Sequence, residues 1–123
     1  MFGKIFLMRC VKTAFGQTLV LESFWEKLRG LMFAPRVEKP LLFVFTNERS
    51  SENAIHSLFC PAFDAIFINS NGVVVGAFEV RSPKLFVCPE EQFKFLVETF
   101  PGDIKKREIK IGVKVGVSDW LKQ

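Results

Sequence analysis

The chain carries a series of short apolar runs, rich in β-branched and aromatic residues, that are separated by turn-forming residues. After residue 40 these runs occupy residues 41–46, 55–59, 64–69, 73–80, 85–88, 93–100 and 109–117. Asn71-Gly72, between two of them, is the strongest turn signal, because a type I′ hairpin turn requires positive φ at both central positions. In the last run, apolar residues alternate with lysine and glycine, as expected for a strand with one buried face. The pattern predicts a mainly β protein.

One short helix is expected before these runs. Residues 4–12 and 17–21 are predicted to form a first hairpin with its turn at 13–16. Ser23 and Glu26 have the spacing of a capping box, and the apolar residues that follow recur at helical intervals, which predicts a helix over residues 24–31. Gly30 and Pro35 mark its end. The expected fold is therefore a single-domain antiparallel β-barrel or sandwich with one short helix.

The length of 123 residues fits one domain over residues 1–123. A chain of this size can bury roughly two thirds of its surface, which is enough for a core without disulfides or metals. No apolar run approaches the roughly 20 residues that cross a bilayer, and Lys4 and Arg9 interrupt the first apolar stretch, which makes it a poor signal peptide. We expect a soluble cytoplasmic protein that does not contact a membrane.

The cysteines indicate reduced thiols. Cys10, Cys60 and Cys88 are odd in number and widely spaced, without a Cys-x-x-Cys motif, so neither a zinc site nor a disulfide framework is expected. Their neighbours are apolar, which predicts that each behaves as a small buried hydrophobic residue and that none is catalytic. Motifs for metals and phosphate loops are also missing from the sequence, so no cofactor is expected.

The charge pattern bears on nucleic-acid binding. The chain has 17 basic and 13 acidic side chains, a net charge of +4, and the basic excess lies at both ends. A basic field attracts nucleic acid, but Lys105, Lys106 and Arg107 lack the interleaved aromatic residues that base stacking uses. Nucleic acid is therefore an unlikely partner. The lack of tyrosine and the single histidine, His56, exclude reactions that need a tyrosine acid or two imidazoles.

Four polar residues form the candidate ligand-binding set: Arg29, His56, Asp64 and Glu98. Asp64 and Glu98 lie inside apolar runs, where a charge is costly unless it is paired or hydrogen-bonded. We expect at least one of the two to pair with Arg29 in a shared cavity, because a guanidinium binds a carboxylate bidentately. Lys27 is another candidate partner for Glu98, and Asp64 has an alternative role as a structural acceptor of backbone N–H groups after Pro61.

A nucleophilic set around His56 is not expected. In a strand, Ser57 points to the opposite face from His56, and Cys60 lies about 13 Å away at roughly 3.3 Å per residue. A proton transfer from either side chain to the imidazole is then out of reach. No catalytic residue and no metal ligand are therefore predicted.

Several motifs resemble an uncharacterised family, domain of unknown function 192. They are residues 26–32 (EKLRGLM), 42–46, 63–68 (FDAIFI), 71–74 (NGVV), 95–98 (FLVE) with Gly102, and 109–115. The resemblance covers about residues 18–117 and implies a mainly β fold of unestablished function. The chain departs from the family pattern at Ala62, Asn69 and Val113, and residues 55–59 replace an aromatic-Met-Lys-Asn-Thr segment.

These observations favour a non-catalytic β-domain that binds a small ligand or a protein segment. The warrant is a set of polar residues inside apolar runs together with the lack of an assembled catalytic motif. The alternative is a small hydrolase or lyase that uses Asp64 or Glu98 as its base with His56. A nucleic-acid-associated role is the third hypothesis, and the sequence leaves the oligomeric state open.

Overall fold

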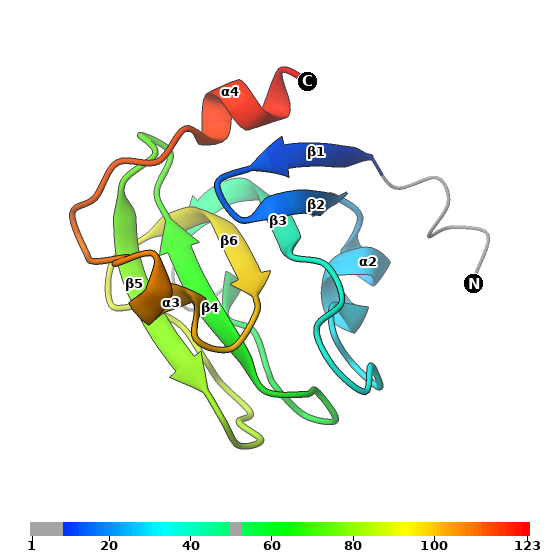
Figure 1. The fold of residues 1–123 in the computed structure, drawn as a ribbon. Coiled ribbons are helices and arrows are strands. Elements are labelled where there is room, and N and C mark those ends of the chain that lie inside the picture. Colours follow the sequence, from blue (N-terminus) through cyan, green and yellow to red (C-terminus); the bar gives the residue numbers. More distant parts are fainter. Residues whose placement is uncertain (1–8, 50–52) are drawn as a thin grey trace.

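A six-stranded mixed sheet forms the centre of the protein, with strand order β1-β2-β3-β6-β4-β5 (Figure 1). The computed structural model describes residues 9–49 and 53–123. Its strands are β1 (Cys10–Thr13), β2 (Gly16–Leu21), β3 (Leu41–Arg49), β4 (Phe63–Ile68), β5 (Val74–Val80) and β6 (Phe93–Thr99). The mainly β prediction is confirmed. The sheet is not closed, and the β2–β3 pair is parallel whereas the other pairs are antiparallel.

The predicted helix is confirmed as α2 (Phe24–Arg29), and it starts with the predicted capping box. The Glu26 N–H donates to Ser23 Oγ at 3.2 Å, and the Ser23 N–H donates to Glu26 Oε1 at 3.2 Å. Gly30 ends the helix with φ 45° and ψ −121°, a conformation that L side chains rarely adopt. Two helical turns that the sequence did not predict follow the sheet, α3 (Asp103–Lys106) and α4 (Val117–Leu121).

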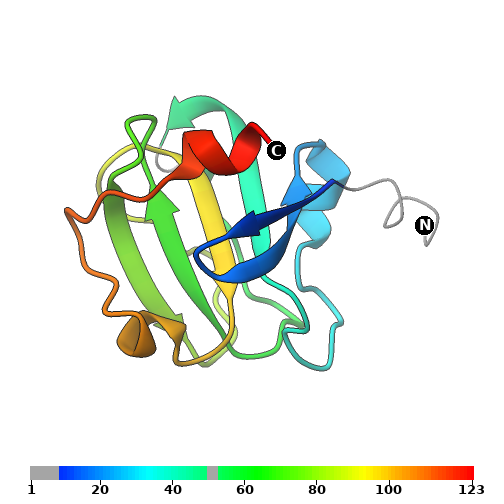
Figure 2. The ribbon, with the colours of Figure 1, turned by 45° about the horizontal axis from the view of Figure 1, so that its top comes forward.

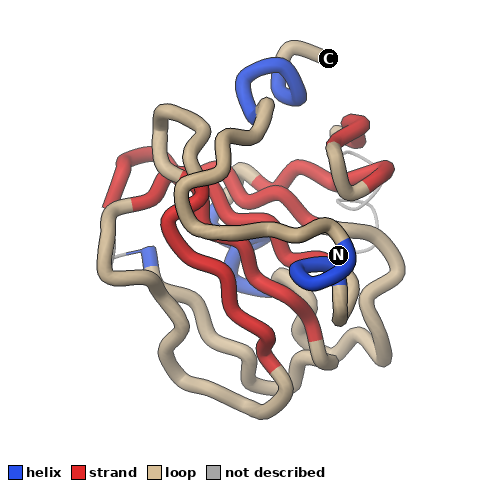
Figure 3. Tube along the Cα trace, turned by 60° about the vertical axis from the view of Figure 1, so that its left-hand side comes forward, coloured by secondary structure: helices blue, strands red, loops and turns tan. Residues whose placement is uncertain are grey.

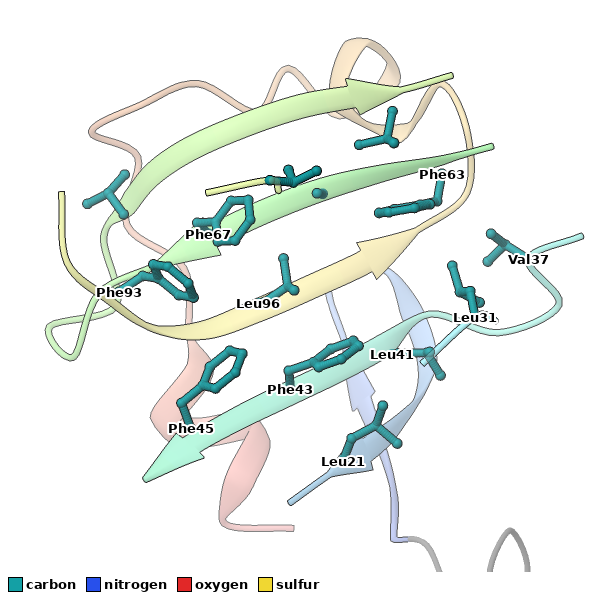
Figure 4. Packing of buried hydrophobic residues seen from close by; sticks show 14 residues of the cluster. Leu21, Leu31, Val37, Leu41, Phe43, Phe45, Phe63, Phe67, Phe93 and Leu96 are labelled. Carbon is teal, nitrogen blue, oxygen red and sulfur yellow. The ribbon is translucent and has the colours of Figure 1, made fainter. Parts of the chain in front are cut away.

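The central strands are covered on both faces. Every residue of β4 is buried, and β6 is buried except at Lys94. One face carries the cluster around Phe43, Phe67 and Leu96, shown in Figure 4, and we call it the α2 face because the end of α2 lies against it. The opposite face is covered by the β1–β2 hairpin and by the C-terminal segment with α4 (Figure 2). Trp120 of α4 packs against Phe15.

The β4–β5 hairpin is confirmed, but its turn is not type I′. Of the two central residues only Gly72 has positive φ, at 80°. Asn69 builds the turn instead, because its Oδ1 accepts the N–H groups of Asn71 and Val73, each at 3.0 Å. A Cβ on Gly72 would lie 2.9 Å from the Val115 carbonyl oxygen, so the C-terminal segment also requires glycine here.

The predicted strands at 55–59 and 85–88 are wrong. Each contributes one residue to an isolated bridge, in which Ile55 and Val87 exchange N–H···O bonds of 3.1 and 2.7 Å. Ser57 holds the two segments together elsewhere, since its Oγ donates to the Ser82 carbonyl at 3.0 Å and accepts the Lys84 N–H at 2.7 Å. The two segments are therefore loops that are fixed to each other and pack against the α2 face. Figure 3 shows the loops and turns of the chain in tan.

The predicted strand at 109–117 is also wrong. The segment makes an isolated bridge between Lys114 and Val73, turns at Gly112 with φ 96°, and enters α4 at Val117. Alternation fails as a guide because Ile111 is 70% exposed rather than packed. The predicted hairpin at the N-terminus is confirmed for β1 and β2, while residues 4–8 of its first arm lie outside the described residues.

Replacing Ser23 with alanine tests the helix start. Ser23→Ala removes the side-chain acceptor of the capping box, and we expect the free energy of unfolding to fall by about 1 kcal/mol. Urea denaturation of the variant and the parent measures the change. Ser118→Ala is the control, because Ser118 is an exposed α4 residue of similar size and should leave the midpoint unchanged. An unchanged midpoint for Ser23→Ala would contradict the cap.

Candidate functional site

Asp64, one of the four polar residues predicted for the site, is fully buried in β4 and hydrogen-bonded through both oxygens. Oδ1 accepts from the Arg81 guanidinium at 2.7 Å, and Oδ2 accepts the backbone N–H groups of Gly102 at 3.1 Å and Ile104 at 2.9 Å. The predicted pairing with Arg29 is therefore wrong for Asp64. Its predicted alternative role as an acceptor of backbone N–H groups is right in kind, but the donors lie at the start of α3 rather than after Pro61.

Arg81 is a residue that the sequence analysis missed. It follows β5 directly, and its Nη1 also donates to the Phe63 carbonyl at 2.9 Å. The β4–β5 register, in which Asp64 faces Glu79 and Phe63 faces Val80, brings Arg81 beside the start of β4. Counting outward from the predicted Asn71-Gly72 turn would have found this pairing.

A pocket lies between the C-terminal half of α2, the start of β3 and the loop after residue 53. It encloses about 240 Å³. Its lining residues are Lys27, Leu28, Arg29, Gly30, Leu31, Phe43, Phe45, Asn53, Ala54, Ile55, His56 and Cys60. Two of the four predicted site residues, Arg29 and His56, are thus brought together, although they are far apart in the chain. Asp64 does not line this pocket.

Glu98 lies directly behind the pocket wall. It is 3% exposed, and its Oε1 has no hydrogen-bond partner within the described part of the chain. A Cβ built on Gly30 would lie 3.4 Å from Oε1 and 3.1 Å from Phe43 Cζ. Because Gly30 has no side chain, the wall between the pocket and the Glu98 carboxyl is thin at this point. The sequence flagged Glu98, but it carried no signal that Gly30 would lie over it.

Desolvation controls the protonation of the acidic groups around the pocket. Burial raises the pKa of Glu98 to about 8, so the carboxyl is mostly protonated at neutral pH. Burial, together with the charge of Glu98, raises the pKa of the Cys60 thiol to about 11. A thiol with such a pKa is a poor nucleophile at neutral pH.

Two cations border the pocket. Lys27 is held in place, because its Nζ donates to the Val44 carbonyl at 3.1 Å and lies 5.0 Å from the centre of the Phe45 ring. Burial lowers the pKa of Lys27, while the nearby Glu22 and Glu26 oppose the shift. Within residues 9–49 and 53–123, Arg29 forms no ion pair, so its predicted pairing with Glu98 is not made either.

The polar atoms near His56 do not form a nucleophilic set. His56 Nδ1 accepts the Leu58 N–H at 3.1 Å, whereas the Ser57 hydroxyl is bonded to the loop at residues 82–84. The strand geometry assumed for these residues was wrong, yet the imidazole and the hydroxyl are still turned to different partners. The buried position predicted for the cysteines is wrong for Cys10, which is exposed, and Cys60 and Cys88 are partly buried.

Two phenylalanines outside the pocket lining contact each other between neighbouring loops. Phe33 and Phe59 have left-handed φ values of 67° and 59°, which are unusual for aromatic residues. Their rings stack with centroids 5.3 Å apart, and the Phe33 N–H donates to the Phe59 carbonyl at 2.7 Å. This contact joins the segment after α2 to the loop that carries His56 and Cys60.

In the basic cluster at residues 105–107, the side chains of Arg107 and Lys105 contact neighbouring parts of the protein. Arg107 donates to the Ala14 carbonyl at 2.7 Å and lies 3.5 Å from Asp103, and Lys105 lies 3.9 Å from Glu79. Arg107 thus links α3 to the turn between β1 and β2, whereas the Lys105 side chain is 80% exposed. Base-stacking aromatic residues were not expected here. Among the described residues, no helix is long and apolar enough to cross a membrane.

Comparison with known proteins places the chain among uncharacterised sequences. A family model, DUF192, described as an uncharacterized ACR, matches residues 11–117. A UPF0127 protein of Thermococcus sibiricus is 31% identical over 106 residues, covering 85% of this chain and 66% of that protein. A UPF0127 protein of Pyrococcus furiosus is 36% identical over 93 residues, covering 74% of this chain and 78% of that protein. The chain therefore spans just under two thirds of the first relative.

The fold is shared with a solved structure. The crystal structure of a protein of unknown function from Novosphingobium aromaticivorans matches with a TM-score of 0.71 and 18% identity, covering 87% of this chain and 81% of that one. At this identity the likeness concerns the fold alone.

Replacing Asp64 with asparagine tests the buried ion pair. Asp64→Asn keeps the shape of the side chain but removes the negative charge to which Arg81 and two backbone N–H groups donate hydrogen bonds. We expect the free energy of unfolding to fall by roughly 3 kcal/mol. Urea denaturation measures it. Glu79→Gln is the matched control, because Glu79 contacts the same guanidinium from a half-exposed position and should change stability by less than about 1 kcal/mol. Equal effects of the two variants would contradict the assignment.

Glu98 should make stability depend on pH. Its folded-state pKa of about 8 lies above the ordinary 4.5, so its contribution is fully present below pH 4.5 and is lost as pH rises towards 8. For one proton the loss reaches about 1.4 kcal/mol per pH unit. Thermal denaturation between pH 5 and 9 should show a falling Tm in the parent and a flatter profile in Glu98→Gln. Parallel profiles would show that Glu98 does not titrate in this range.

Proposed function

The chain belongs to the DUF192 family of uncharacterised proteins, and from the geometry of its pocket we propose that it is a binding domain for a small ligand. The pocket is formed by α2, β3 and the loop around residues 53–60. Its volume of about 240 Å³ exceeds the roughly 150 Å³ of a cavity that holds benzene, so a ligand of one ring with polar substituents has room.

The unpartnered carboxyl of Glu98 is the observation that carries this proposal. A buried polar atom without a hydrogen bond destabilises a fold by about 1–3 kcal/mol, and such atoms are rare in native proteins. The contrast with Asp64 is informative, since Arg81 and the backbone N–H groups at the start of α3 supply three donors to one buried carboxylate, whereas Oε1 of the other has none. A ligand that reaches Glu98 past Gly30 would supply the missing partner.

The lining supports binding in its chemistry as well. Phe43, Phe45, Leu31 and Ile55 give the pocket apolar walls, and a few polar groups converge at its edges. Ligand sites in proteins commonly have this composition. A protein segment is a less favoured occupant, because a pocket of about 240 Å³ has room for a side chain rather than for a length of backbone.

A small hydrolase or lyase is the second candidate function, because a carboxyl whose pKa is near 8 can give and take protons near neutral pH. In this alternative Glu98, which lies behind Gly30, is the acid or base, and His56 is a residue of the pocket lining. Asp64 is not retained, because both of its oxygens are already bonded. Binding is favoured over catalysis because Ser57 and Cys60 offer no activated nucleophile. The cytoplasmic location expected from the sequence stays a prediction.

Filling the pocket tests the binding proposal. Ala54 lines the pocket, so Ala54→Phe should abolish the rise in Tm caused by a bound ligand. The matched control is Ala62→Phe, which adds the same ring at an exposed loop position outside the lining and should keep the shift. The probes are one-ring compounds carrying a carboxylate, an amide, an alcohol or an amine, measured at millimolar concentration by thermal denaturation. The lack of a shift with all four classes in the parent protein would contradict the proposal.

A further inference from the structure

We propose that the pocket beside α2 selects small organic anions, and that Arg29 binds the anionic group of the ligand. The ligand class is a partly apolar molecule with one carboxylate. The inference rests on the proposed binding function and adds to it the charge of the ligand and the residue that recognises this charge.

The lining of the pocket carries basic but no acidic side chains. Among the residues that line the pocket, Lys27 and Arg29 are basic and none is aspartate or glutamate. The nearest buried acid, Glu98, lies behind Gly30 and is mostly uncharged at neutral pH because burial raises its pKa to about 8. The pocket therefore presents a positive potential inside largely apolar walls, where charges interact more strongly than in water.

The two cations of the lining differ in whether their side chains already have partners. Lys27 is already committed, since its ammonium group donates to the Val44 carbonyl and lies over the Phe45 ring. Arg29 ends α2, lines the same pocket and makes no ion pair within the described ranges. A guanidinium with open donors binds a carboxylate through two parallel hydrogen bonds. Lys27 thus adds to the potential, and Arg29 supplies the contact.

Glu98 lies behind Gly30, at the wall of the pocket. A protonated Glu98 has one O–H to donate and oxygen lone pairs to accept, and its Oε1 is unpartnered. A hydroxyl group on the ligand can satisfy either role. When Glu98 ionises, it places a negative charge close to a bound anion, so binding should weaken with rising pH. The other titratable or charged groups of the lining are Lys27, Arg29, His56 and Cys60, and Cys60 stays protonated because its pKa is raised to about 11.

The experiment compares two probes of nearly equal shape, 4-hydroxybenzoate and its uncharged amide, 4-hydroxybenzamide. Isothermal titration calorimetry with the whole protein at pH 7 should give a Kd at least tenfold lower for the carboxylate. In Arg29→Gln the carboxylate should lose this advantage while the amide Kd stays the same. Arg36→Gln is the matched control, because Arg36 is outside the lining and 79% exposed, and its side chain forms only a 3.7 Å surface pair with Glu38.

A second arm uses pH. Between pH 7 and 9 the carboxylate Kd of the parent should rise several-fold, and in Glu98→Gln it should change much less. Circular dichroism confirms that each variant is folded before titration. Equal Kd values for the two probes, or an Arg29→Gln variant that keeps the preference for the carboxylate, would overturn the inference and leave the binding function intact. Lack of binding by both probes would overturn it too, and the amine and alcohol probes then decide separately whether the pocket binds neutral or cationic ligands.

Discussion

Coverage of both faces of the central strands is the constraint on which the rest of the structure depends. Strand β4 has no exposed residue, and β6 has one partly exposed residue, so neither face of the sheet centre can be left to water. Burying large apolar side chains stabilises a fold by about 1.5–3 kcal/mol each. The β1–β2 hairpin and the C-terminal segment cover one face. The segment after α2, with Leu31 and Val37, and the loops that carry Ile55 and Val87 cover the other. Each unusual polar feature of the molecule arises where these covers meet the sheet.

The two buried carboxylates show the two outcomes of this arrangement. Asp64 and Glu98 lie on adjacent strands, where Asp64 is paired with Thr99 and Glu98 with Ala65. At Asp64 the cover is α3 and the end of β5, whose backbone N–H groups and guanidinium satisfy the charge. At Glu98 the cover is Gly30, whose missing Cβ permits a close approach but which brings no donor to Oε1. Proteins tend to break such local rules at functional sites, which is why the proposed binding site rests on the second carboxyl and not on the first.

Gly30 connects the fold to the pocket. Its backbone angles end α2, and its missing Cβ allows the helix end to approach Phe43 and Glu98. The same turn leaves Lys27 and Arg29 at the pocket, since they occupy the last turn of the helix. A cation near the C-terminal end of a helix is also favoured by the helix dipole. Helix termination, close packing and a basic pocket edge thus follow from one local conformation.

The sequence alone determined the features that depend on neighbouring residues. Short motifs predicted the capping box at Ser23 and the β4–β5 hairpin, because the interactions that form them lie within a few residues of one another. Short motifs also indicated the mainly β class and the family likeness. Glu98 and Asp64 could be flagged as anomalous, since a charge within an apolar run is unusual wherever the run folds.

Tertiary structure decided the partners of those residues. Arg81 rather than Arg29 reached Asp64, and Gly30 rather than a donor covered Oε1 of Glu98. It also turned the alternating run at 109–117 into an irregular cover, because an apolar pattern specifies which residues prefer burial but not the surface against which they are buried.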